Sequence, residues 1–231
     1  MPSMKKAQDK NYQSRVGALR REKTRNRLIE TALAVFAEKG PDAVIIDDFI
    51  AAAHIARGTF YNYFRTTNDL LAAVVGEASD EVLRVIDPIA QQQADPAQRV
   101  IVGSRLYIAI AVRYPLWGAF IIRTGAQRGA RGQLLDKYLA RDLQAAMDTG
   151  RFKVGNIAVA RNIALGSIMY GIETLLSEQA PDDYVEQAMF SLLRAFGIGA
   201  REARKMASAP IAECPALTGT VFRQSQDRGQ A

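Results

Sequence analysis

Cysteine, histidine and tryptophan are almost absent from this sequence of 231 residues, which contains one of each. Cys214 cannot form a disulfide within the chain, so the protein needs no oxidising compartment. With one histidine, His54, and one cysteine, the common catalytic and metal-binding constellations are missing, and so is a Gly-rich phosphate loop. These absences argue against an enzyme and predict that the chain binds no metal and no cofactor.

Long apolar runs are missing as well. The most apolar stretch, from Tyr107 to Ile122, is interrupted by Arg113 and Pro115 and is too short to span a bilayer. The basic N-terminus is not followed by an uninterrupted apolar segment, which argues against a secretory signal. We therefore expect a cytoplasmic protein that does not bind membranes.

Strand-like alternation is also missing, because apolar residues recur at spacings of three and four along most of the chain. This pattern predicts an all-α fold of about nine helices. The first of them ends at Gly40-Pro41, and two short helices follow over about 46–53 and 57–64. Two short, closely joined helices of this kind are typical of a helix-turn-helix, which binds DNA.

Positive charge is abundant, and it lies at one end of the chain. The sequence has 30 Lys and Arg against 24 Asp and Glu, and its net charge is +6. Nine of the basic residues, but only two acidic ones, lie between Met1 and Arg27. This excess favours an anionic partner, and we expect Arg25 to contact DNA. Residues 1–18 are expected to be a disordered basic arm, followed by a DNA-binding domain over 19–66.

The rest of the chain predicts a larger helical domain over 67–207. Thr66 and Asp69 form a capping box that begins a long helix, and Pro88 is expected to end it. The spacing rules predict five further helices over about 96–113, 115–124, 133–149, 156–179 and 182–196. Beyond about Ala207 the periodicity disappears, so residues 208–231 are expected to be a disordered tail.

The last two of these helices indicate a dimer. Small residues repeat at spacings of four, three and four along the first, beside a bulkier stripe, so two of its faces must be covered. We expect the pair to form a four-helix bundle with a second copy of the chain. The residues expected at this interface are Ala160, Ala164, Ser167, Gly171, Val185, Met189, Leu192 and Phe196. Packing of the small stripe inside one monomer is the alternative.

The helices in the middle of the chain carry candidates for a small-molecule cavity, because they combine aromatic residues and methionine with a few polar tips. These candidates are Tyr107, Arg113, Trp117, Phe120, Ile121, Tyr138, Met147 and Tyr170. Ordinary core positions show the same pattern, so core packing is the alternative for each of them. Arg113 can pair with an anionic group of a ligand or with an acidic residue of the chain itself.

From Thr24 to Val75 the sequence resembles the DNA-binding head of TetR-type repressors. The motifs that carry the resemblance, in this order, are Leu28-Ile29, Ala32, Phe36-Ala37-Glu38-Lys39-Gly40, Gly58-Thr59-Phe60-Tyr61, Tyr63-Phe64 and Leu70-Leu71. The resemblance implies a three-helix head on a larger ligand-binding and dimerisation domain. It implies a ligand-responsive regulator, most often a homodimeric repressor that a small molecule releases from its double-stranded DNA operator.

A recognition helix places its first turns in the major groove. Arg57 and Thr59 occupy the leading turn here, where arginine can bind guanine and threonine can contact a thymine methyl group. Gly58 lets the helix approach DNA closely because it has no side chain.

The resemblance adds further DNA contacts. It implies that Tyr61 and Tyr63 contact phosphates, with packing of one of them against the first helix as the alternative. We expect Asn62 to reach a base or the backbone. Thr67 stands where the family commonly has a phosphate-binding lysine.

Besides Thr67, four positions depart from the family pattern. His54 stands in the tight turn where glycine is usual, and Ala56 cannot cap the recognition helix. Asp47 and Asp48 stand where neutral or basic residues approach DNA more easily. These departures leave one alternative open, a dimeric helical interaction module whose head does not bind DNA specifically.

Overall fold

The computed structural model describes residues 2–124, 133–177, 180–213, 215–219 and 222, and these contain helices but no strands. Ten helices lie in this part of the chain: α1 (Pro2–Lys39), α2 (Ile46–Ala53), α3 (Arg57–Tyr61), α4 (Thr67–Ala90), α5 (Pro96–Arg113), α6 (Pro115–Thr124), α7 (Gln133–Asp148), α8 (Ile157–Ser177), α9 (Tyr184–Ala195) and α10 (Ala200–Ser208). The all-α prediction is confirmed, with α10 as a helix that the sequence analysis did not predict.

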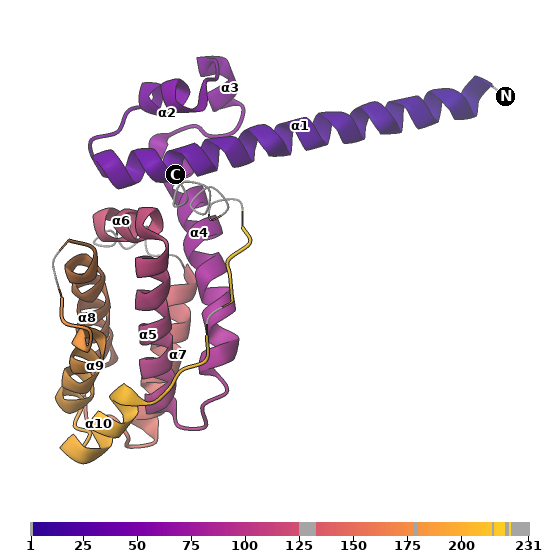
Figure 1. Ribbon diagram of the computed structural model, residues 1–231. Coiled ribbons are helices and arrows are strands. Elements are labelled where there is room, and N and C mark those ends of the chain that lie inside the picture. Colours follow the sequence, from indigo (N-terminus) through magenta and orange to yellow (C-terminus); the bar gives the residue numbers. More distant parts are fainter. Residues whose placement is uncertain (1, 125–132, 178–179, 214, 220–221, 223–231) are drawn as a thin grey trace.

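Helix α4 joins a small head to a larger helical body (Figure 1). In the head, α2 and α3 lie on one side of α1, and α6 of the body packs against the other side. From the head, α4 runs along the body beside α5 and α7, while α8 and α9 lie beyond α5. Among the described residues, no single helix is long and apolar enough to cross a membrane. Within the described residues, α5 and α6 reach the required length and hydropathy only when taken together, and the two helices meet at a bend of 115°.

The core of the head continues into the body through aromatic side chains. The ring of Phe36 on α1 lies 5.0 Å from that of Phe49 on α2, and Phe49 lies 6.4 Å from Phe60 on α3. On its other side, Phe36 lies 6.3 Å from the ring of Phe120 on α6. Each of these four residues is fully or almost fully buried. The orientation of the head therefore depends on α6 as well as on α4.

The N-terminal segment differs from the prediction. Residues 1–18 were expected to be a disordered arm, but α1 begins at Pro2 and continues to Lys39 without a break. The physical reason is local composition: the segment is rich in Ala, Lys, Gln and Arg, which favour helix, and it has no glycine before Gly17. Its only proline stands at the first helical position, where proline is tolerated.

Helix α4 begins as predicted but ends later. The Thr66 hydroxyl accepts a hydrogen bond from the Asp69 N–H at 3.0 Å, and the Asp69 carboxylate accepts one from the Thr66 N–H at 3.1 Å. Pro88, expected to end the helix, lies inside its last turn, where a missing N–H costs a single bond. Buried residues extend along α4 from Leu70 to Ala90, so this helix belongs to both parts. The domain boundary after residue 66 remains a prediction.

The described residues after α10 also differ from the prediction of a disordered tail, while residues 223–231 of that prediction lie outside the described residues. Leu217 is only 3% exposed and Phe222 is fully buried, both of them against the body. Such a segment docks through backbone hydrogen bonds and a few apolar side chains rather than through a periodic face. The periodicity on which the prediction relied is therefore absent even though the segment packs.

Candidate functional site

The first candidate site is the surface formed by α2, α3 and the turn between them. His54 lies in this turn with φ 50° and ψ 53°, the left-handed conformation that glycine usually adopts and that histidine tolerates better than most residues. Its N–H donates to the Ala51 carbonyl at 3.3 Å, which closes α2. The turn sets α3 at an angle to α2, as a helix-turn-helix requires.

Helix α3 has no side-chain cap, as Ala56 predicts. The Ala56 carbonyl still accepts hydrogen bonds from the N–H groups of Thr59, at 2.9 Å, and Phe60, at 3.3 Å. Phe60 is fully buried against Phe49 and Phe64, so this ring holds the short helix on the head. Packing thus stabilises α3 where capping does not.

The residues predicted to contact DNA divide by exposure. Four of them are exposed on one surface of α3 and its C-terminal end: Arg57, Gly58, Tyr61 and Asn62. A Cβ atom at Gly58 would have no neighbour within 4 Å, so this surface is open. Thr59, Tyr63 and Thr67 are half-buried beside it. Four of the eight predicted residues are therefore exposed at α3, while three others, at α3, just after it and at the start of α4, are only partly accessible.

Arg25, the eighth residue, does not belong to this surface. Its guanidinium forms an ion pair with Glu77 of α4 and lies 6.0 Å from the centre of the Phe64 ring. The charge of Arg25 therefore fastens α1 to α4. The contact of Arg25 with DNA stays a prediction, because the sequence shows the positive charge of this segment but not which helix face carries each residue.

The two aspartates at the start of α2 have different functions. Asp48 accepts a hydrogen bond from the Ile45 N–H at 2.9 Å and pairs with Lys39 at 2.6 Å. The backbone bond, and then the bond from Lys39, lower the pKa of Asp48. Asp47 instead accepts two bonds from the Arg57 Nη2, at 2.5 and 2.6 Å, and these raise the pKa of Arg57. Asp47 therefore orients and partly neutralises an exposed arginine of α3.

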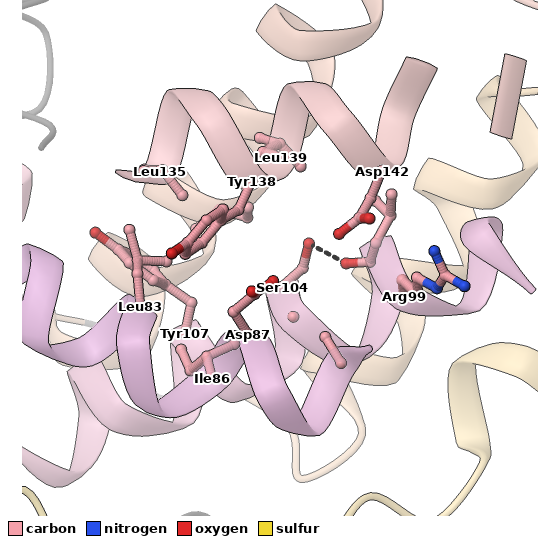
Figure 2. A pocket seen from close by; sticks show the side chains of 14 residues that line it. Leu83, Ile86, Asp87, Arg99, Ser104, Tyr107, Leu135, Tyr138, Leu139 and Asp142 are labelled. Atoms are coloured by element: carbon pink, nitrogen blue, oxygen red, sulfur yellow. Dashed lines mark hydrogen bonds between the residues drawn. The ribbon is translucent and has the colours of Figure 1, made fainter. Parts of the chain in front are cut away.

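The second candidate site is a cavity of about 40 Å³ between α4, α5 and α7 (Figure 2). Most of its lining is apolar, with acidic, basic and hydroxyl groups at a few positions. The lining residues are Leu83, Ile86, Asp87, Ala90, Arg99, Val100, Gly103, Ser104, Tyr107, Leu135, Tyr138, Leu139, Asp142 and Ile168. An apolar cavity with a few convergent polar groups is typical of small-molecule sites.

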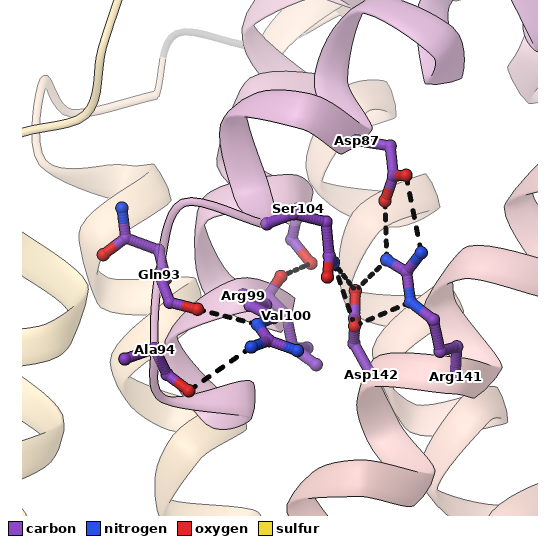
Figure 3. A network of polar contacts seen from close by, with 9 residues as sticks. Asp87, Gln93, Ala94, Arg99, Val100, Ser104, Arg141 and Asp142 are labelled. Carbon is purple, nitrogen blue, oxygen red and sulfur yellow. Dashed lines mark hydrogen bonds and ion pairs between the residues drawn. The ribbon is translucent and has the colours of Figure 1, made fainter.

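Polar contacts connect several of the residues that line this cavity to their neighbours (Figure 3). Arg141 binds Asp87 at 2.5 Å and Asp142 at 2.8 Å, and these two carboxylates raise the pKa of the guanidinium. Asp142, only 5% exposed, also accepts a hydrogen bond from Gln91 at 3.2 Å. The Arg99 guanidinium donates to the backbone carbonyl of Gln93 at 2.7 Å. These bonds hold the charged groups in place without a ligand.

Tyr107 differs from the other polar lining residues because its hydroxyl has no hydrogen-bond partner among the described residues. The side chain is 1% exposed, and burial, followed by the charge of Asp80, raises the pKa of the phenol. Tyr107 therefore stays protonated at neutral pH and can donate a hydrogen bond. A buried hydroxyl without a partner is costly, typically by about 1–3 kcal/mol, so it marks a position where a ligand group or a water can bind.

Of the eight predicted ligand residues, only Tyr107 and Tyr138 line the cavity. Trp117, Phe120 and Ile121 are buried in the packing of α6, and Met147 is half-buried against the core. Arg113 and Tyr170 are exposed.

The prediction also missed Asp87, Arg99, Ser104 and Asp142, which line the cavity. For Asp87 and Asp142 the sequence did contain an indication of such a position. Each stands among apolar residues at helical spacing, where a charge is unexpected.

The small-residue stripe of α8 packs inside the monomer, which corrects the predicted dimer interface. Six of the eight predicted residues are buried by their own chain: Ala160, Ala164, Gly171, Met189, Leu192 and Phe196. Only Ser167 and Val185 are partly exposed. A Cβ at Gly171 would lie 3.7 Å from Ile108 of α5 and 4.0 Å from Tyr184 of α9. Small residues here let α5 and α9 approach α8 closely.

A neighbouring stripe of α8 is exposed instead. Its apolar residues Val159, Ile163 and Tyr170 are 49%, 38% and 72% exposed. Gly166 lies between them at helical spacing, and nothing lies within 4 Å of the position of its Cβ. An apolar stripe on an outer helix is the kind of surface through which subunits associate.

Two family models match this chain. One is described as bacterial regulatory proteins of the tetR family and matches residues 28–74. The other is described as a tetracyclin repressor-like C-terminal domain and matches residues 95–209. The first match contains the helix-turn-helix, and the second contains α5 to α10.

The chain is also similar to individual proteins. The solved structure of RolR in complex with resorcinol is 34% identical, with a TM-score of 0.64 over 86% of this chain and 100% of that chain. The transcriptional repressor DhaR of Mycobacterium sp. (strain GP1) is 29% identical over 75 residues, 32% of this chain and 38% of DhaR. The transcriptional regulator YvdT of Bacillus subtilis (strain 168), uncharacterized, is 40% identical over 48 residues, 21% of this chain and 25% of YvdT. The chain thus spans well under half of these two curated relatives.

Proposed function

The chain belongs to the TetR family of ligand-responsive, DNA-binding transcription regulators, and we propose that it is a homodimeric repressor. In this proposal, α3 of each subunit binds one half of an operator, and a small uncharged molecule in the cavity releases the protein from DNA. Such a regulator functions in the cytoplasm, where its operator DNA is located.

The observation that carries the DNA-binding part is the exposed surface of α3. Arg57, Gly58, Tyr61 and Asn62 face solvent together, and the apolar side of the same short helix is buried. Arginine and asparagine are suited to base edges, and tyrosine to phosphates. The exposed basic residues Arg20, Arg21 and Lys23 lie on α1, a helix that extends well beyond α2 and α3 (Figure 1). They add attraction for the DNA backbone.

A titration of the protein against the DNA upstream of its own gene, followed by fluorescence anisotropy, tests this proposal. We expect binding that resists competitor DNA and weakens at least about tenfold between 50 and 200 mM salt, because phosphate contacts release counterions. If the protein is an intact dimer without such binding, the repressor proposal is wrong and the interaction-module alternative takes its place.

The cavity supports an uncharged effector. Its lining contains the carboxylates of Asp87 and Asp142 and one guanidinium, that of Arg99, which backbone carbonyls already hold. Among the described lining residues, the two carboxylates outnumber the single guanidinium, and this excess of negative charge disfavours an anionic ligand. Carboxylates and carbonyls accept hydrogen bonds, so a hydroxylated molecule is favoured. The ligand of the relative RolR, resorcinol, has this chemistry.

The size of the cavity suggests how effector and DNA compete. A single aromatic ring needs a cavity of about 150 Å³, several times the space present. Binding must therefore move α4, α5 or α7 apart. Because α4 also carries part of the head's packing, this movement changes the position of the head. In a dimer, it changes the separation of the two recognition helices.

The Tyr107 hydroxyl provides a test of this effector site. Tyr107→Phe removes a hydroxyl without a partner, so the melting temperature should stay the same or rise. If that hydroxyl binds the effector, the Kd for resorcinol measured by calorimetry should rise about three- to tenfold. Tyr170→Phe, at an exposed position outside the cavity, is the matched control and should leave the Kd unchanged. An unchanged Kd in the Tyr107 variant would remove Tyr107 from the site, and 3-hydroxybenzoate binding as tightly as resorcinol would contradict an uncharged effector.

A further inference from the structure

The chain beyond α10 returns along the body toward the head (Figure 1). We call residues 209–213, 215–219 and Phe222 the C-terminal strap. At its beginning, the Ala209 carbonyl accepts a hydrogen bond from the Arg105 guanidinium of α5. Ile211 is half-buried beside Leu106 and Ile110 of the same helix. The strap thus follows α5 from the far end of the body.

The middle of the strap binds two elements at once. The N–H groups of Thr218 and Gly219 donate to the Glu81 carboxylate of α4, at 3.1 and 2.6 Å. The neighbouring Leu217 N–H donates to the Tyr114 hydroxyl, between α5 and α6, at 3.3 Å. A side chain at residue 219 would overlap the Glu81 carboxylate, so glycine permits this approach. The strap therefore bridges α4 and the junction of α5 with α6.

Phe222 anchors the far end of the strap. Its ring is fully buried and lies 5.2 Å from the ring of Tyr114 and 6.2 Å from that of Trp117. Aromatic side chains bury a large apolar area and pack with specific geometry. This contact makes the strap part of the core of the body.

We propose that the C-terminal strap is a clamp that holds the head in its operator-binding orientation. The head rests on two supports, α4 and α6, the second through the contact of Phe36 with Phe120. Glu81 lies on α4 between the turns that pack in the head and those that line the cavity. By joining Glu81 to Tyr114 and Trp117, the strap fixes the two supports relative to each other.

The same strap is linked to the cavity. Trp117 contacts Phe222 and also contacts the cavity-lining Tyr107, at a ring distance of 5.0 Å. The clamp therefore stabilises the form in which the cavity is nearly closed. By thermodynamic linkage, releasing the strap favours an open cavity and lowers affinity for the operator. This consequence for DNA rests on the proposed function. The fixing of α4 relative to α6 by the strap does not.

Trp117 is the only tryptophan of the chain, so its fluorescence reports on the strap directly. Phe222→Ala should expose the Trp117 indole and increase its quenching by acrylamide about twofold or more. Amide hydrogen exchange around Glu81 should accelerate about tenfold, because α4 loses a partner. Glu81→Ala, which changes a partly exposed side chain, should accelerate the same amides and guards against a general folding defect of Phe222→Ala. Ala216→Ser, at an exposed strap position, is the control and should behave as wild type. Unchanged quenching and exchange in both variants would overturn the clamp.

Measurements of operator affinity distinguish a strap that only stabilises the body from a strap that also controls DNA binding. We expect both Phe222→Ala and Glu81→Ala to weaken operator binding about fivefold or more, because couplings between sites typically reach this size. Faster exchange in α4 with unchanged operator affinity would overturn the proposed control of the head and leave only a structural strap. If the wild-type protein itself does not bind the operator, the proposed function fails, and the fluorescence and exchange results still decide the clamp.

Discussion

Replacing Ile163 by aspartate is expected to convert the proposed dimer to a monomer and to abolish high-affinity operator binding. Ile163 lies in the middle of the exposed apolar stripe of α8, with Val159 on one side and Gly166 and Tyr170 on the other. If this stripe packs on its copy about a two-fold axis, each new carboxylate is buried opposite its counterpart. Burial of unpaired like charges is among the most destabilising changes that an interface can undergo.

The expected loss of DNA binding is large because, in the proposed function, the dimer binds two half-sites at once. In a dimer, binding of the first head gives the second head a high effective concentration at its half-site. A monomer lacks this advantage, so its operator binding should be weaker by at least about a hundredfold. Light scattering after size-exclusion chromatography measures the mass, and anisotropy measures the affinity. Val112→Asp is the matched control, since Val112 is 40% exposed on α5, outside the α8 stripe, and should leave a dimer. A dimeric Ile163→Asp protein would place the interface elsewhere.

The second large effect is expected at Arg57. This guanidinium is exposed at the start of α3, and Asp47 holds it by two hydrogen bonds in the free protein. Arg57→Ala should weaken operator binding about ten- to a hundredfold, because it removes an arginine suited to a guanine edge and leaves the Asp47 carboxylate unpaired near phosphates. Anisotropy titration at constant salt measures the change.

A double variant tests the part that Asp47 plays. In Arg57→Ala with Asp47→Ala, the repulsion between Asp47 and DNA is gone, so affinity should recover about threefold or more relative to Arg57→Ala alone. Asp48→Ala is not a suitable control because Asp48 caps the start of α2. If Arg57→Ala binds the operator as wild type does, α3 is not inserted with this residue toward the bases.

The local features of the fold were predictable from the sequence. Helix α2 was expected over about 46–53 and spans Ile46–Ala53, and the Thr66 and Asp69 capping box begins α4. His54 has the left-handed conformation expected of the turn. These features depend on residues within a few positions of one another, so periodicity, capping and turn chemistry identify them.

Contacts between distant segments were not predictable in the same way. Both stripes of α8 are apolar in the sequence, but only packing decides that Ala160, Ala164 and Gly171 face their own chain while Ile163 and Tyr170 remain exposed. Small residues permit two helices to approach closely, and the pattern does not say whether the partner belongs to the same chain.

The sequence by itself thus determined an all-α chain with a helix-turn-helix, because helical periodicity and turn residues act locally. Only the tertiary structure decided which groups meet across the chain. It brought Asp87 of α4 and Asp142 of α7 to one cavity, moved Arg25 into a pair with Glu77, and seated Phe222 on Trp117. Each of these pairs is separated by at least 50 positions in the sequence, and the partners are chosen by the way whole helices pack. No spacing rule within one helix contains that information.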